Sequence, residues 1–208
     1  DSKNTDTLTV KKDLNVTGNI TTSKTLDVTG SVSAANLTNE GSVSVGGTLT
    51  VSGDVSNTNT ITVVGKVIAE DVTNSGNLTF RNGAEINDFI NNGSAYITGS
   101  TSANNITNNE EKIFNITGDV IAQSITNKGD MDITGNAAAE VLISNSAALD
   151  VTGTLTTVDF TNNGTANISE NLISTGILNN TDALTVEGHA GLNDVTNSGT
   201  LTLKNGAD

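Results

Sequence analysis

The sequence contains no cysteine and no proline, and only 2% of its 208 residues are aromatic. The absence of cysteine excludes disulfide bonds and thiolate metal sites. A strand that is paired on both sides cannot spare its backbone N–H, so the absence of proline is typical of a fold in which every strand is interior. Apolar residues make up only 34% of the chain, and a compact globule built from so few of them would be marginal.

Basic residues are also scarce, because 9 Lys and Arg stand against 23 Asp and Glu, for a formal net charge of −14. Nucleic acids and anionic membrane surfaces attract clustered positive charge, so we expect neither as a partner. No apolar run approaches the length of a membrane-spanning helix. The chain begins with Asp1 rather than Met, and we expect it to be a processed or excised segment.

A short repeat runs through the whole sequence. The segment TLDVTGSVSAANLTNEG at 25–41 recurs as TITVVGKVIAEDVTNSG at 60–76 and as ALDVTGTLTTVDFTNNG at 148–164. Copies spaced by 17–19 residues begin at Thr7, Thr25, Ser42, Thr60, Asn77, Ser94, Ile113, Asp130, Ala148, Thr165, Ala183 and Thr200. A fixed short period of this kind is the signature of a solenoid, in which each copy forms one turn.

Two positions of the repeat are apolar in every copy. The second position holds Leu8, Leu26, Val43, Ile61, Leu78, Ala95, Phe114, Met131, Leu149, Ala166, Leu184 and Leu201. The fourth holds Val10, Val28, Val45, Val63, Phe80, Ile97, Ile116, Ile133, Val151, Ile168, Val186 and Leu203. Apolar residues spaced by two predict strands with alternate side chains inside, and the breaks between such runs predict corners. We therefore expect three short strands in each coil.

The predicted fold class is all-β, a single-stranded parallel β-helix (β-solenoid) of about 12 coils with 17–19 residues each and a triangular cross-section. We expect a right-handed coil because the turns vary in length by a residue or two. We also expect a single domain over residues 1–208, with a lead-in at 1–6, eleven full coils at 7–199 and a partial last coil at 200–208.

Two residue types are expected at the corners. The sixth position is usually Gly, and Asn82 and Asn205 replace it where a positive φ is expected. A Thr-Asn pair closes most coils, and its Asn recurs as Asn39, Asn74, Asn91, Asn108, Asn127, Asn162 and Asn197. These amides either hydrogen-bond to one another along the axis or simply tolerate the left-handed corner conformation, and both explanations remain open.

Three coils carry an additional apolar residue near their end, at Ile90, Ile143 and Leu178. If these side chains point outward, they provide an apolar face for lateral bundling. If a bulge turns them inward, they belong to the core.

Residues suited to catalysis are few, with one Arg (Arg81) and one His (His189) in the chain. Asp132 and Asp150 share an outward position on adjacent coils, flanked by Asn115 and Asn167. Two carboxylates at this spacing are weak candidates for a calcium site, because oxygen ligands suit Ca²⁺. A retaining glycosidase uses a similar pair, but a flat face has no cleft to exclude water. We predict no catalytic residue and no cofactor beyond this weak possibility of calcium.

The sequence is rich in N-x-Ser/Thr motifs. Glycosylation would modify Asn15, Asn19, Asn36, Asn77, Asn92, Asn105, Asn115, Asn163 and Asn167 in a host that glycosylates exported proteins. Such motifs are also unavoidable in a repeat made largely of Thr and Asn.

The segments LDVTGSVSA (26–34), LTVSGDVS (49–56) and VTNSGNLTF (72–80) resemble the coils of filamentous-haemagglutinin-type adhesins and of bactofilins, which are polymer-forming β-helix proteins. The resemblance is one of repeat pattern and extends over nearly the whole chain. It implies a structural or adhesive polymer without catalytic activity.

We find no amphipathic helix that would cap either end, so the terminal strands are expected to be open to pairing. The expected function is that of a structural subunit of an extracellular or cell-surface fibre, which assembles head-to-tail with copies of itself by coil stacking. The alternatives are a rigid stalk segment of a large surface adhesin and, third, a carbohydrate-active β-helix enzyme.

Overall fold

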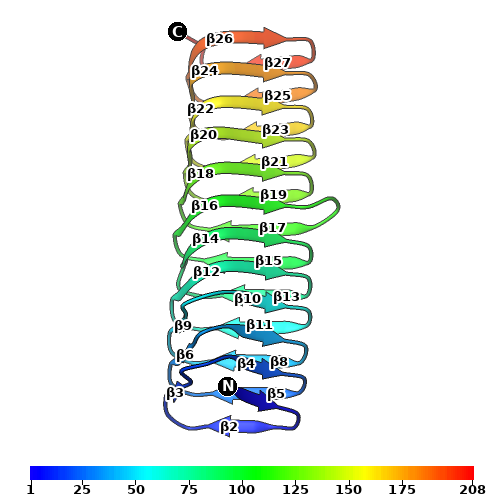
Figure 1. Cartoon of the computed structure of the whole chain (residues 1–208). Coiled ribbons are helices and arrows are strands. Elements are labelled where there is room, and N and C mark those ends of the chain that lie inside the picture. The colour runs from blue at the N-terminus through cyan, green and yellow to red at the C-terminus, as the bar shows by residue number, and fades with distance from the viewer. The chain divides into compact units, whose positions relative to one another are not determined.

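The computed structural model describes residues 1–208, and all of its regular elements are β-strands (Figure 1). The chain divides into two compact units, residues 1–102 (unit 1) and residues 103–208 (unit 2). It forms no α-helix with the length and hydropathy needed to cross a bilayer. The expectation of a single domain over 1–208 stays a prediction.

Unit 1 consists of short strands at first and of longer ones later. Its strands are β1 (Ser2–Asn4), β2 (Leu8–Val10), β3 (Leu14–Asn15), β4 (Ile20–Thr22), β5 (Thr25–Val28), β6 (Val32–Ala34), β7 (Leu37–Asn39), β8 (Ser42–Val45), β9 (Leu49–Val51), β10 (Val55–Asn57), β11 (Thr60–Val63), β12 (Val67–Asn74), β13 (Asn77–Phe80), β14 (Ala84–Asn91) and β15 (Ser94–Thr98). Strand β16 (Thr101–Asn108) contains the boundary between the units.

Unit 2 alternates four- or five-residue strands with strands of eight or nine residues. Its strands are β17 (Ile113–Thr117), β18 (Val120–Asn127), β19 (Asp130–Ile133), β20 (Ala137–Asn145), β21 (Ala148–Val151), β22 (Leu155–Asn162), β23 (Thr165–Ile168), β24 (Leu172–Asn180), β25 (Ala183–Val186), β26 (Ala190–Asn197) and β27 (Thr200–Leu203).

In both units each inner strand pairs in parallel with the equivalent strand one turn earlier and one turn later. We call one turn a rung. In unit 1 the short-strand sheet has the order β2-β5-β8-β11-β13-β15, and in unit 2 it has the order β17-β19-β21-β23-β25-β27. The long-strand sheet follows β1-β4-β7-β10-β12-β14 in unit 1, with β3, β6 and β9 beside it, and β18-β20-β22-β24-β26 in unit 2. Figure 1 shows this stacking within each unit. The chain is therefore a parallel β-solenoid of about twelve turns, as predicted.

The prediction of three separate strands in every coil is wrong beyond the first rungs. From β12 onward, one strand of eight or nine residues replaces two consecutive short strands. The long strand still contains the corner. In β12, for example, Glu70 and Asp71 both point away from the core, while Ala69 and Val72 are buried. Hydrogen bonding between rungs thus continues through the bend. The handedness of the coil stays a prediction.

The core consists of the two apolar columns identified in the sequence together with the inward side of the long-strand sheet. Of the 24 residues in the two columns, 20 are buried. The four exceptions are Leu8 and Val10 in the first rung and Leu201 and Leu203 in the last. The predicted first residues of the repeats also agree with the structure, because every strand of the short-strand sheet from β5 to β27 begins at one of them.

The three additional apolar residues do not behave alike. Ile90 points outward and is 38% exposed, whereas Ile143 and Leu178 are buried at 1% and 0%. Strands β20 and β24 contain nine residues instead of eight, and the register with the neighbouring strands shifts in both. The extra residue changes the alternation of the side chains, so Ile143 and Leu178 enter the core.

The closing Asn residues form a continuous hydrogen-bonded column in each unit. Within unit 1, Asn39 donates through Nδ2 to Asn57 Oδ1 at 2.7 Å, and Asn57 donates to Asn74 Oδ1 at 2.7 Å. In unit 2 the same bond, 2.7–3.0 Å long, links Asn108, Asn127, Asn145, Asn162, Asn180 and Asn197 in order. Of the two explanations that the sequence left open, the amide ladder is therefore present. Its members Asn57, Asn145 and Asn180 were missed because they have neither Thr directly before them nor Gly two residues after them.

Glycine at most corners is required by the close approach of rungs, whereas a positive φ is found only at Gly83, Gly99, Gly118 and Gly206. Neither Asn82 nor Asn205 has a positive φ, so that expectation is wrong. At Gly164, an added Cβ would overlap the backbone of Ser146 and Ala147 one rung earlier. At Gly191, by contrast, an added Cβ would meet nothing within 4 Å.

We expect Gly164→Ala to lower the free energy of unfolding by about 2 kcal/mol, because the rungs must separate to admit the methyl group. Gly191→Ala in the same unit is the matched control and should change stability by less than about 0.5 kcal/mol. Denaturant unfolding followed by circular dichroism measures both. Equal effects of the two substitutions would show that rung contact does not select glycine.

Asn145→Asp should destabilise the protein by at least about 3 kcal/mol at pH 7, because it places a buried carboxylate against the oxygens of Asn162, Ala147 and Thr165. Asn163→Asp is the matched control. Its side chain is exposed and its Oδ1 accepts a bond from Thr181 Oγ1, which a carboxylate also accepts. Thermal unfolding of both variants checks this prediction, and similar melting temperatures would contradict it.

Candidate functional site

The candidate site is a column of polar side chains on the outward face of the short-strand sheet of unit 2. Its members are Asn115 on β17, Asp132 on β19, Asp150 on β21 and Asn167 on β23, which are direct register partners on four successive rungs. The alternation of these strands forces the column outward, because the residues on either side of each member are core residues. The structure therefore brings together the two carboxylates that the sequence singled out.

Hydrogen bonding within this column is uneven. Asn167 Nδ2 donates to Asp150 Oδ1 at 2.7 Å, which compensates part of the charge of Asp150. At the other end, Asn115 Oδ1 is buried and has no hydrogen-bond partner. The column thus contains one hydrogen-bonded pair, Asp150 and Asn167, and one buried amide oxygen without a partner, at Asn115.

Asp132 has a raised pKa. Partial desolvation of its carboxyl group, the negative charge of Asp150 on the next rung and that of Asp130 on the same strand all favour the protonated form over the ionised one. Strands in a sheet lie about 4.8 Å apart, so the two carboxylates repel each other across a single rung.

This geometry offers little for catalysis or tight metal binding. Calcium requires six to eight oxygen ligands, and no group of three or more Asp, Glu, His or Cys side chains converges in the structure. A shallow depression lies elsewhere in unit 2, lined by Ile173, Ser174, Thr175, Gly191, Leu192, Asn193 and Asp208. Calcium binding at Asp132 and Asp150 stays a prediction.

The single His and the single Arg lie in different units. His189 is exposed in unit 2, as expected for a corner residue, and its Nε2 lies 3.0 Å from Asp208 Oδ2. Arg81 follows β13 in unit 1 and is exposed. Neither residue belongs to the Asp132–Asp150 column.

The nine predicted glycosylation sites differ in accessibility. Asn36, Asn92 and Asn115 are half-buried, and the exposed ones are Asn15, Asn19, Asn77, Asn105, Asn163 and Asn167. Asn36 and Asn167 use Nδ2 as a hydrogen-bond donor, to Asn19 Oδ1 and Asp150 Oδ1 respectively. A glycan on either would replace that bond, and glycosylation stays a prediction at all nine positions.

No protein-family model, curated protein or solved structure gives a significant match to the chain. The repeat architecture is therefore shown by the structure itself. The resemblance to adhesin coils and bactofilins stays a hypothesis, since no relative confirms it.

Asp132→Asn should raise the melting temperature at pH 7 by about 1–2 °C, because it removes one of two repelling charges. A carboxyl group with a raised pKa in the folded state costs stability as pH rises above its ordinary value of 3.8. The gain should therefore vanish below that pH. Glu140→Gln, which neutralises an exposed residue on the long-strand sheet, is the control. A gain that is independent of pH would show that charge repulsion is not the cause.

Proposed function

We propose that the chain is a non-enzymatic structural segment of an extracellular fibre, whose rungs are continued at either end by strand pairing with another copy. The observation that carries this proposal is the contrast between inner and terminal rungs. Val195 on β26 is 46% exposed, whereas Leu178, its register partner on β24, is 0% exposed. Core positions in the last rung thus present apolar surface that a further rung would cover.

The terminal rung of unit 1 supports the same proposal. Strands β1 and β2 are end strands of their sheets, and Leu8 and Val10 are only half-buried. An end strand offers unpaired backbone N–H and C=O groups, which readily pair with another chain. No helix covers either terminal rung. A further rung stacked on β1 and β2 would pair with these backbone N–H and C=O groups and bury the ends of the apolar columns.

The mechanism of such a fibre is mechanical. Backbone hydrogen bonds run from rung to rung, and the Asn column adds a second set of bonds in the same direction. The excess of negative charge would keep the sides of neighbouring fibres apart. Lateral bundling through the three additional apolar residues would depend on Ile90, the outward-pointing one.

A stalk segment of a surface adhesin is the second candidate. It rests on the same exposed terminal rungs, with the further rungs supplied by the continuing chain of a longer protein instead of by a second copy.

Negative-stain electron microscopy and light scattering of the purified 208-residue chain test the proposal. We expect particles whose mass grows with concentration and whose width stays constant. Monomers alone at concentrations of about 1 mM would overturn assembly by rung stacking and leave the stalk as the better candidate.

A further inference from the structure

The Asn column has a direction. In each bond of unit 2 the Nδ2 donor belongs to the earlier rung and the Oδ1 acceptor to the later one. The same Nδ2 also reaches a backbone carbonyl on the later rung, as Asn162 does with Ala183 O at 2.9 Å and Asn180 with Thr200 O at 3.0 Å. Every inner Asn therefore directs its amide donors toward the C-terminal end of its unit.

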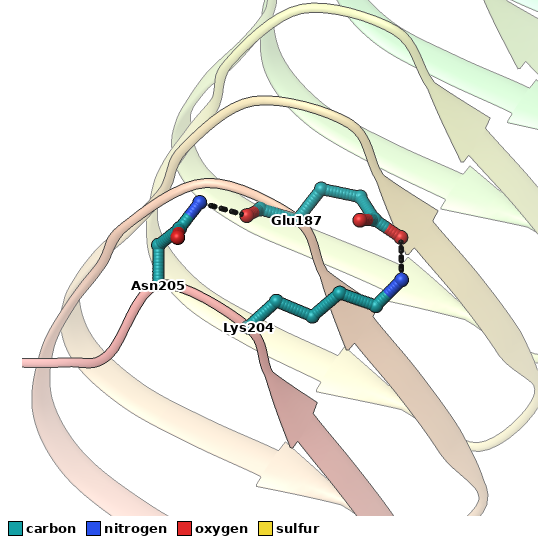
Figure 2. Close-up of polar contacts among 3 residues, drawn as sticks. All are labelled: Glu187, Lys204 and Asn205. Atoms are coloured by element: carbon teal, nitrogen blue, oxygen red, sulfur yellow. Dashed lines mark hydrogen bonds and ion pairs between the residues drawn. The ribbon is translucent and has the colours of Figure 1, made fainter.

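This column ends at Asn197 with unused donor capacity. Its Nδ2 makes one hydrogen bond, to Gly199 O of its own corner at 3.2 Å. The two acceptors that each inner Asn finds on the next rung are missing, and Asn197 is exposed where Asn180 is 0% exposed. The last rung is nevertheless well held. Figure 2 shows Lys204 Nζ paired with Glu187 Oε1 at 2.6 Å and Asn205 Nδ2 donating to Glu187 O at 2.6 Å.

The first rung of unit 1 offers the complementary group. Asn4 occupies the same column, in register with Thr22 and through it with Asn39. Its Nδ2 donates to Thr22 Oγ1 at 2.9 Å and to Thr25 O at 2.7 Å, as inner Asn residues do. Its Oδ1 receives only a long bond of 3.4 Å from the Asp6 amide. Since a carbonyl oxygen has two lone pairs, this Oδ1 can accept a further donor.

We propose that the last rung of one copy binds the first rung of a second copy in a fixed register, with Asn197 Nδ2 donating to Asn4 Oδ1 and to the Thr7 carbonyl. This inference rests on the proposed function and specifies its contact. The register places Leu201 and Leu203 against Leu8 and Val10, so the two apolar columns continue across the junction. Because one end supplies donors and the other acceptors, growth is head-to-tail and two like ends do not join.

The charges of the two terminal regions favour this pairing. Residues 1–24 contain four Lys and three Asp, although the whole chain has only 9 basic residues against 23 acidic ones. Residues 182–208 contain one Lys and four carboxylate side chains. A basic first region and an acidic last region attract each other, whereas two acidic ends repel. A second copy therefore fits the last rung better than an arbitrary acidic chain does.

The register can be tested by disulfide cross-linking, because the chain has no cysteine of its own. Thr9 and Thr202 are both exposed and would be direct partners across the junction, with Cα atoms about 5 Å apart. That spacing permits a disulfide, whereas about 8 Å between Thr9 and Thr200, two residues away, does not. We expect the Thr9→Cys/Thr202→Cys chain to give a ladder of covalent oligomers on a non-reducing gel, and the Thr9→Cys/Thr200→Cys chain to remain largely monomeric.

The amide contact is tested by Asn197→Ala against Asn193→Ala, an exposed outward position on the same strand. Loss of one interfacial hydrogen-bonding group should raise the critical concentration for assembly roughly tenfold for Asn197→Ala and leave it unchanged for the control. Circular dichroism verifies that both variants fold. Filaments that form normally while neither cysteine pair cross-links, or while both Ala variants assemble alike, would overturn this contact and leave the proposed function standing. Absence of filaments from the unmodified chain would overturn both.

Discussion

The in-register stacking of rungs at about 4.8 Å is the constraint on which the rest of the structure depends. Each residue must tolerate a neighbour from the same column directly above and below it. Asn meets this demand well, because an amide donates on one side and accepts on the other, and the column in unit 2 uses both groups at Asn127, Asn145 and Asn162. Glycine meets it where backbones come too close for a Cβ, as at Gly164. Like charges do not meet it, and at Asp132 partial desolvation together with the negative charge of Asp150 on the next rung raises the pKa.

The same constraint explains how a chain with 34% apolar residues and few aromatics forms a buried core. Each rung buries only a handful of side chains, and these pack against the equivalent side chains of adjacent rungs. Volume is balanced within a rung as well as along a column. Phe80 lies in register with Val63 of the preceding rung, and Ala84 lies in register with Val67 of that same rung. The larger side chain of Phe80 is thus balanced by the smaller side chain of Ala84 within one rung. All four side chains are at most 1% exposed. A core of this kind lengthens without becoming wider, so it does not need a large hydrophobic interior.

The sequence predicted the short-strand sheet almost residue by residue, because each of its strands has two inward positions and ends at a corner rich in Gly. The long-strand sheet was harder to predict, since its bend lies inside a hydrogen-bonded strand and places two outward residues, such as Glu70 and Asp71, in succession. An extra residue at that bend turns Ile143 and Leu178 inward, which is one of the two alternatives that the sequence left open. The repeat pattern located the last rung, but the exposure of Val195 and the single hydrogen bond of Asn197 Nδ2 depend on the side-chain geometry of that rung, which the pattern alone does not encode.

Repetition also determines where specific chemistry can arise. Catalytic and metal sites need different groups that converge from several directions, but the outward face of a stacked sheet presents parallel columns whose members point the same way. Asp132 and Asp150 illustrate this, because their neighbours Asn115 and Asn167 extend the column without closing around it. A terminal rung is different, since it alone combines exposed core side chains, unpaired strand edges and an incompletely bonded Asn. The surfaces of this chain that differ most from the rest are therefore its first and last rungs, and recognition by another rung uses the same interactions that fold the protein.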